Sequence, residues 1–260
     1  MTQSSRARIY STQAIVLRRI DQGEADRIVT LLTPERGKQR VLAKSARKIT
    51  SRKAGHIELF TRTQLLIAKG RNLDLITQAE LIEPYRPLRE DMARGAQAHY
   101  LCELAEQFAP EDSDASALYD LLAEGLSWLC AARDPHMAAR YFESRLLTLE
   151  GYRPELFKCA KTGDALEIDR DINVERQAFS AQESGTILNS LAAMARDTIF
   201  IPRSTLMLMR VVQTSTFEQI DALTVSRDMQ AQLERATQNY LNYVLERRPR
   251  SAAFIKQLGA

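Results

Sequence analysis

Cationic side chains crowd into one short segment near the start of the chain. Residues 36–53 hold eight lysines and arginines and no acid. These cations are Arg36, Lys38, Arg40, Lys44, Arg47, Lys48, Arg52 and Lys53. Like charges this close repel across screening lengths of roughly 10 Å, and a phosphate backbone relieves that repulsion. The segment is either a solvated loop or a polyanion-binding site, and we predict the second.

The kind of nucleic acid does not follow from this spacing. Small barrels that bind single strands add aromatic rings on which bases stack. Tyr10 and Phe60 are the candidates, and either ring would suit a hydrophobic core equally well. Duplex DNA, single-stranded DNA and RNA therefore all stay open at this point.

Residues typical of enzymes are missing from the sequence. There is no G-x-x-x-x-G-K phosphate loop and no G-x-S-x-G nucleophile turn. His56, His99 and His136 are isolated from one another. Glu24 and Asp26 form an acidic pair that would suit a metal-dependent nuclease, but in a strand and turn they suit solvent or Arg27 equally. We expect no catalytic residues and no cofactor.

The cysteines do not indicate a metal or a disulfide framework. Cys102, Cys130 and Cys159 are three in number and widely spaced. Structural zinc needs four ligands, usually in two close pairs, and Thr162 stands where a partner of Cys159 would be. We therefore expect no bound metal, and we expect Cys102 and Cys130 to lie in the core.

The residues before position 84 show the pattern of short strands. Five β-branched or leucine-rich runs occur, at 14–17, 27–32, 40–43, 64–67 and 74–77, and residues 33–37 supply Pro and Gly for a hairpin turn. Five short strands suit a small closed barrel. This part carries sixteen Lys and Arg against eight Asp and Glu, or +8, whereas the rest carries −5. Such asymmetry indicates a polyanion partner for the first part.

The sequence pattern changes from that of strands to that of helices after Pro84 and Pro87. Apolar residues recur every four positions at 96–108 and 118–129, and further helices are expected at 135–149 and near Ser184, Ser204 and Ser226, the last reaching about Arg248. Residues 159–179 lack a period and suggest an irregular insert or a small hairpin. We predict an α+β protein with domains at 1–83 and 84–260, and an insert at about 155–183.

No segment of the sequence indicates export or a membrane span. The longest stretch without a charge is 184–195, which is too short to cross a bilayer, and residues 1–8 lack the apolar centre of a signal peptide. A cytoplasmic protein without a membrane partner is expected.

Several stretches together resemble the RecO family of bacterial recombination mediators. In the first domain they are 14–17, 23–27, 32–34 with Gly37, 43–48 with 51–52, 59–60 and 78–80. In the second they are Tyr100, 103–104, 140–143, 146–147 and 151–154. The run at 43–48 is the most characteristic, and the order and spacing of all the pieces cover nearly the whole chain.

The resemblance implies an N-terminal OB-fold β-barrel followed by an α-helical C-terminal domain. It implies binding of single- and double-stranded DNA, annealing of complementary strands, and help in loading recombinase onto coated strands. Implied partners are single-strand-binding protein, through its acidic C-terminal tail, and the RecR mediator, with the RecF protein and the RecA recombinase as further candidates. Nucleoid association is implied too. Many relatives hold zinc with four cysteines, and this chain keeps only Cys159.

The resemblance also assigns roles to particular residues. The segment 36–53 is the DNA-binding candidate, and Arg247, Arg248 and Arg250 extend it. The alternative is that these three arginines only balance the partial negative charge at the C-terminal end of a helix. Arg140 resembles a residue directed toward the acidic tail, with a surface arginine paired with Glu143 or Ser144 as the alternative. Because the tail is also apolar, Arg145, Leu146 and Leu149 are added to its groove. The rival functions are an RNA-binding OB-fold module, a metal-dependent nuclease and a scaffold that binds through its helical half.

Overall fold

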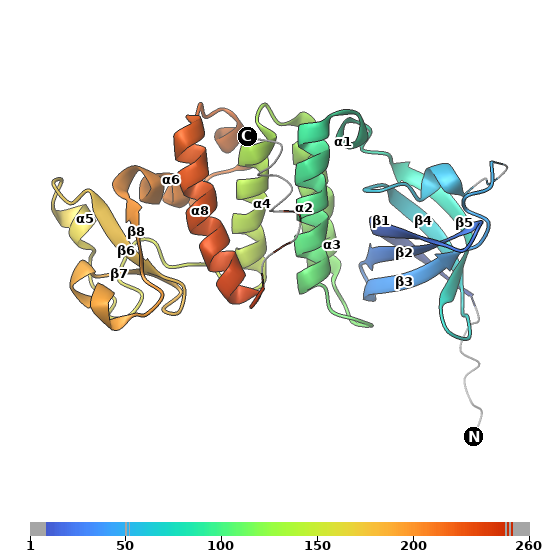
Figure 1. The fold of residues 1–260 in the computed structure, drawn as a ribbon, viewed down its shortest axis with the longest axis horizontal. Coiled ribbons are helices and arrows are strands. Elements are labelled where there is room, and N and C mark those ends of the chain that lie inside the picture. Colours follow the sequence, from blue (N-terminus) through green and yellow to red (C-terminus); the bar gives the residue numbers. More distant parts are fainter. Residues whose placement is uncertain (1–8, 50, 52, 248, 250, 252–260) are drawn as a thin grey trace, which may run out of the picture. The chain divides into compact units, whose positions relative to one another are not determined.

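A computed structural model describes residues 9–49, 51, 53–247, 249 and 251. These residues divide at position 130 into two compact units, which we call the first and the second unit. The five labelled strands of the first unit and the smaller sheet of the second can be followed in Figure 1. The predicted domain boundary at residue 83 stays a prediction, because it concerns folding units rather than contacts.

The first unit is built on a closed five-stranded barrel. Its strands are β1 Ile9–Gln22, β2 Asp26–Thr33, β3 Gly37–Ala43, β4 Arg62–Ala68 and β5 Asp74–Glu83. The order around the barrel is β1-β2-β3-β5-β4, with β3 and β5 parallel and the other neighbours antiparallel. Each of the five predicted runs lies within one strand. The predicted fold class, an OB-like barrel followed by a helical part, is confirmed.

Both faces of β1 are covered over four consecutive residues. Alternate residues of a strand point to opposite faces, yet Ala14 to Leu17 are all at most 3% exposed. The pairing of β1 with β2 shifts between Val16 and Arg18, and Val16 instead exchanges hydrogen bonds with residues 60 and 61, at 2.9 and 3.0 Å. One face of β1 therefore fills the barrel core and the other is covered as well.

Helices complete the first unit. They are α1 Pro87–Glu90, α2 Met92–Phe108 and α3 Ser116–Ala131. Asp91 caps α2 by accepting a hydrogen bond from the backbone of Arg94 at 2.9 Å. The predicted apolar stripes are confirmed, since Tyr100 and Leu104 on α2 and Leu122 on α3 are completely buried.

The turn at Gly37 yields a prediction about stability. Gly37 has a φ of 59°, and a Cβ there would lie 2.2 Å from the Pro110 carbonyl oxygen, to which Lys38 donates a backbone hydrogen bond. We expect Gly37→Ala to lower the free energy of unfolding by at least about 2 kcal/mol, from a strained φ and a backbone clash. Urea unfolding measures this loss.

Gly23 supplies a matched control for that substitution. Its φ of 58° is equivalent, but a Cβ at Gly23 meets no atom within 4 Å. Gly23→Ala should therefore cost only the strain, about 1 kcal/mol. Equal losses for the two variants would show that the approach to Pro110 has no energetic weight.

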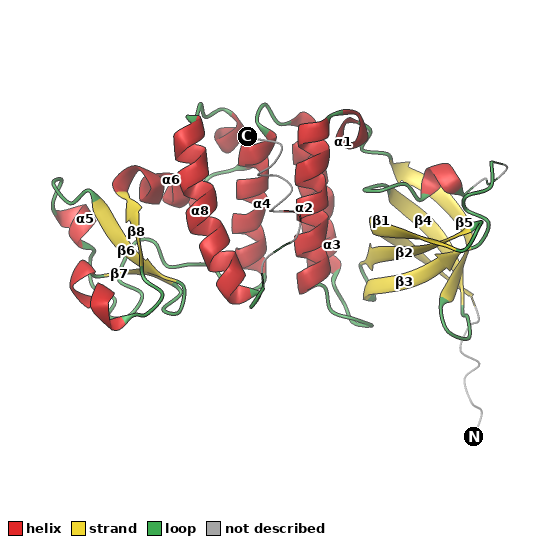
Figure 2. Cartoon of the chain, viewed as in Figure 1, coloured by secondary structure: helices red, strands yellow, loops and turns green. Residues whose placement is uncertain are grey.

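The second unit combines helices with a small antiparallel sheet, coloured by type in Figure 2. Its helices are α4 Pro135–Leu149, α5 Glu167–Arg170, the 3-10 turn η2 Asn189–Met194, α6 Arg203–Thr214, α7 Phe217–Asp221 and α8 Arg227–Val244. Its strands are β6 Arg176–Ser180, β7 Gly185–Ile187 and β8 Ile199–Pro202, in the order β7-β6-β8. The helices predicted at 135–149 and near Ser204 and Ser226 are confirmed. None of the described helices is long and apolar enough to cross a membrane.

The helix predicted near Ser184 is wrong. Residues 185–187 pair with β6 as strand β7 instead. The side chain of Asn189 then ends the strand, because its amide oxygen accepts from the Ala178 backbone at 2.8 Å and its amide nitrogen donates to the Arg176 carbonyl at 3.0 Å. These tertiary bonds override the helical pattern of the apolar run.

Hydrogen bonds hold the insert together. Gln177 is completely buried and donates to the Ile187 carbonyl at 2.6 Å. Cys159 is buried as well. Burial opposes its ionisation, but hydrogen bonds from Thr162, Leu188 and Lys161 outweigh burial and lower the pKa of the thiol. Among the described residues, no group of three His, Cys, Asp or Glu is placed to hold a metal ion.

Candidate nucleic-acid interface

The basic segment follows one side of the barrel. It starts in the β2–β3 turn, runs along β3 and ends in the loop before the short 3-10 turn η1 Ala54–His56. Arg36 lies in the turn, Lys38 and Arg40 lie on β3, and the other described cations lie in the loop. Arg52 falls outside the described residues.

Two cations near the turn are engaged by the protein itself. The Arg36 guanidinium lies 4.3 Å from the centre of the Tyr10 ring. The Lys38 ammonium lies 3.4 Å from a carboxylate oxygen of Glu111. Both side chains are only partly exposed, so part of their charge is already balanced or covered.

Two cations of the loop are also held. Arg47 pairs with Asp21 at 3.3 Å and donates to the Gly23 carbonyl at 2.9 Å. Lys53 donates to the Ile76 carbonyl at 2.9 Å. These bonds fasten the loop to the barrel, and they use donors that a phosphate would otherwise take.

The remaining three described cations point into solvent. Arg40, Lys44 and Lys48 are exposed, and their side chains form no ion pair or hydrogen bond with any described residue. On β3, Arg40 alternates with the buried Val41, which fixes its outward direction. We call Arg40, Lys44 and Lys48 the exposed trio. Within the described part of the chain, no side chain competes with an anion for its charge.

The loop that carries Lys44 and Lys48 is fixed in place. Asp26 accepts a hydrogen bond from the Ser45 backbone at 2.7 Å, and the Arg47 backbone donates to the Ala25 carbonyl at 2.9 Å. Ala46 between them is 1% exposed and belongs to the barrel core. Asp26, considered above as a metal ligand, thus serves as a support for the loop. A backbone that is already fixed loses less conformational entropy when a ligand binds to it.

Ile49 is a feature that the sequence pattern did not reveal. Its side chain is fully exposed directly after Lys48. An apolar side chain beside cations can wedge against unstacked bases. In the sequence, no periodic pattern distinguishes Ile49 from an isoleucine of the core. Only its exposure in the structure sets it apart.

Neither aromatic candidate of the barrel offers a free stacking face. Phe60 is 2% exposed and packs edge-on against His99, with ring centres 4.9 Å apart. Tyr10 is partly buried under Arg36 and donates to Asp74 at 3.0 Å. Burial, and then the bond to Asp74, raises the pKa of Tyr10 to about 12. Neither ring is therefore available for base stacking.

The residues predicted to bind the acidic tail do not form one exposed groove. Arg140 pairs with Glu143 at 2.9 Å, as the alternative interpretation expected, but both side chains are buried, at 6% and 0% exposed. Leu146 is completely buried, which removes it from any surface. Arg140 and Glu143 thus form an ion pair in the core and not at the surface.

The other two residues of that set remain accessible. Leu149 is 41% exposed. Arg145 is partly exposed, donates to the Ser215 carbonyl at 2.6 Å and lies 4.8 Å from the centre of the Tyr141 ring. Of the C-terminal basic residues, Arg247 is exposed just after α8, whereas Arg248 and Arg250 lie outside the described residues.

A closed OB-like barrel with exposed cations, followed along the chain by a helical unit with a small sheet, defines a class of two-part barrel-and-helix proteins. Residues 7–85 match the family described as "Recombination protein O N terminal", and residues 89–253 match "Recombination protein O C terminal". The chain belongs to the RecO family.

Individual relatives agree with this assignment over nearly the full length. The chain is 38% identical over 250 residues to the DNA repair protein RecO of Roseiflexus sp., covering 96% of this chain and 86% of the relative. It is 33% identical to the protein of the same name from Dehalococcoides mccartyi, covering 96% of both. For Pelotomaculum thermopropionicum the identity is 34%, over 97% and 95% of the two chains. The predicted family is confirmed.

Proposed function

We propose that this protein acts in recombinational DNA repair as a mediator that binds single- and double-stranded DNA and anneals complementary strands without catalysing a covalent step. The observation that carries this proposal is the exposed trio, which lies on strand β3 and on the fixed loop that follows it in an OB-like barrel. Family membership supports a role in DNA repair and recombination.

The proposed mechanism is electrostatic. Two complementary strands repel through their phosphates, and cations that neutralise phosphates release condensed counterions and lower this repulsion. Arg40, Lys44 and Lys48 would contact the backbone, which carries no sequence information, so strands of any sequence can pair. This chemistry needs no general acid, general base or cofactor.

The second unit would bring the protein to its place of action. We propose that it contacts the acidic tail of single-strand-binding protein through the accessible Arg145 and Leu149, and that the RecR mediator, the RecF protein and the RecA recombinase act with it in loading recombinase. Docking on a coated strand raises the effective concentration of the barrel there. The setting would be the cytoplasm, at the nucleoid.

Annealing of two complementary fluorescent oligonucleotides tests this function. The wild-type chain should accelerate annealing at low salt, and the acceleration should fall as salt rises. Repeating the assay with strands coated by single-strand-binding protein tests the mediator role. Matched RNA strands that compete better than DNA would instead favour the RNA-binding module, and cleavage of labelled DNA in Mg²⁺ would favour the nuclease.

A further inference from the structure

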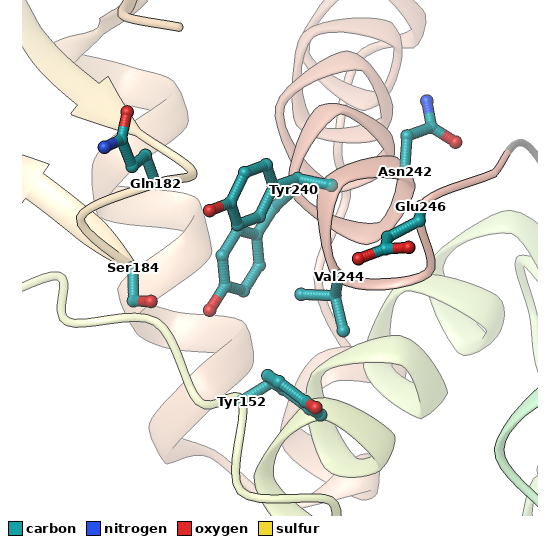
Figure 3. A pocket seen from close by; sticks show the side chains of 8 residues that line it. Tyr152, Gln182, Ser184, Tyr240, Asn242, Val244 and Glu246 are labelled. Carbon is teal, nitrogen blue, oxygen red and sulfur yellow. The ribbon is translucent and has the colours of Figure 1, made fainter.

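A hollow of about 580 Å³ lies on the second unit where three segments meet. Tyr152 follows α4, and Gln182 lies in the turn between β6 and β7. Tyr240 and Tyr243 lie in the last turns of α8, and Glu246 follows that helix. Figure 3 shows the side chains of Tyr152, Gln182 and Tyr240 arranged around this space. Its volume falls within the roughly 300–1,000 Å³ typical of ligand sites.

Tyrosine rings form the walls of this hollow. Tyr152 is 46% exposed and Tyr243 is 50% exposed, although apolar rings gain free energy when they are covered. Tyr240 is only 2% exposed and is held edge-on against Phe179, with ring centres 5.8 Å apart. One fixed ring and two half-exposed rings thus face one cavity. This arrangement fits a flat aromatic ligand.

The polar groups of the hollow match the edge of a nucleobase. The side chains of Gln182 and Glu246 are exposed and form no hydrogen bond or ion pair with other described residues. An amide offers a donor and an acceptor, and a carboxylate accepts from N–H groups on the edges of bases, including the ring N–H of thymine. Because the Glu246 carboxylate repels phosphate, a base rather than the backbone would enter.

Positive charge lies next to the hollow, where a backbone would run. Arg247 directly follows Glu246 and is exposed. It is also the first residue of the basic segment predicted at the C-terminus. A strand whose base entered the hollow would therefore carry its phosphate toward a guanidinium. Stacking rings with an adjacent cation are the combination that single-strand binders use.

We propose that this hollow is a nucleobase-binding pocket for unpaired DNA, in which a base stacks on Tyr243 and Tyr152. The inference rests on the proposed DNA binding and adds a second contact point to it. A base in a duplex is paired and stacked and does not reach the pocket without costly extrusion. The pocket thus supplies the strand preference that the backbone contacts of the barrel lack.

Titration of Tyr243→Ala with oligo-dT and with a duplex tests the pocket. We expect single-strand affinity to fall about 5-fold to 150-fold, the range for loss of one stacked base, with duplex affinity unchanged. Tyr243→Phe keeps the ring and should bind like the wild type. An oligonucleotide containing 2-aminopurine should change its emission with the wild type and not with Tyr243→Ala.

Phe200→Ala is the matched control, because Phe200 is similarly exposed, at 48%, and does not line the hollow. Equal oligo-dT affinity of the wild type and Tyr243→Ala would overturn the pocket proposal, and so would a loss of duplex affinity by the same factor as the loss of single-strand affinity. The proposed function would stand in either case. Tyr243-dependent binding of a decaproline peptide with unchanged DNA affinity would also overturn it. A wild-type chain that binds no oligonucleotide would refute both.

Discussion

Replacing Arg40, Lys44 and Lys48 by Glu is expected to weaken oligonucleotide binding at least about 100-fold at moderate salt, because three phosphate contacts are lost and three repulsions are created. The slope of log K against log salt should become shallower by roughly 2 for a single strand, at about 0.7 per contact. Fluorescence anisotropy of a labelled oligo-dT across a salt series measures both quantities. Annealing should be lost in parallel.

The control for the exposed trio keeps the same change in net charge. Arg170, Arg196 and Arg227 are exposed cations of the second unit whose side chains have no partner among the described residues. Their joint replacement by Glu should change binding far less. If both triple variants lost affinity equally, overall charge and not the exposed trio would explain DNA binding.

Removing Arg140 is expected to destabilise the second unit by about 3–5 kcal/mol, because Arg140→Ala takes the guanidinium away from a buried carboxylate. Glu143 is completely buried and lies 2.9 Å from the guanidinium. Urea unfolding followed by tyrosine and tryptophan fluorescence measures the loss. Any weaker binding of an acidic tail by this variant would then reflect unfolding.

The double variant Arg140→Met with Glu143→Leu tests whether the two charges are needed at these buried positions. Removing both charges removes both desolvation penalties, so its stability should approach or exceed that of the wild type. Arg140→Ala with wild-type stability would show that the ion pair is not structurally required. Arg145→Glu, at a partly exposed position, is the better probe of tail binding.

The strands were predictable because their signal is local. Each barrel strand contains a β-branched or leucine-rich run, and Gly37 marks a turn that requires a positive φ. The helix missed near Ser184 depended on Asn189, whose amide bonds to strand β6 are invisible in the sequence. A local sequence pattern determines whether a segment forms a helix or a strand only where tertiary hydrogen bonds do not compete with it.

The positive charge of the candidate site was predictable from the sequence, but the arrangement of its side chains was not. Residues 36–53 stand out in the sequence, yet their availability depends on Asp21, Glu111 and the carbonyl of Ile76, which lie far away along the chain. The burial of Arg140 likewise depends on tertiary packing. The tyrosine hollow joins segments about ninety residues apart, by the separation of Tyr152 and Tyr243, and no spacing rule would have grouped them.

A salt titration of oligo-dT binding by the wild-type chain is the most direct test of the attraction between the barrel loop and a phosphate backbone. Log K should fall linearly with log salt, with a slope of about −2 or steeper, as expected for at least three neutralised phosphates on a single strand. A slope near zero, or no binding at low ionic strength, would contradict it.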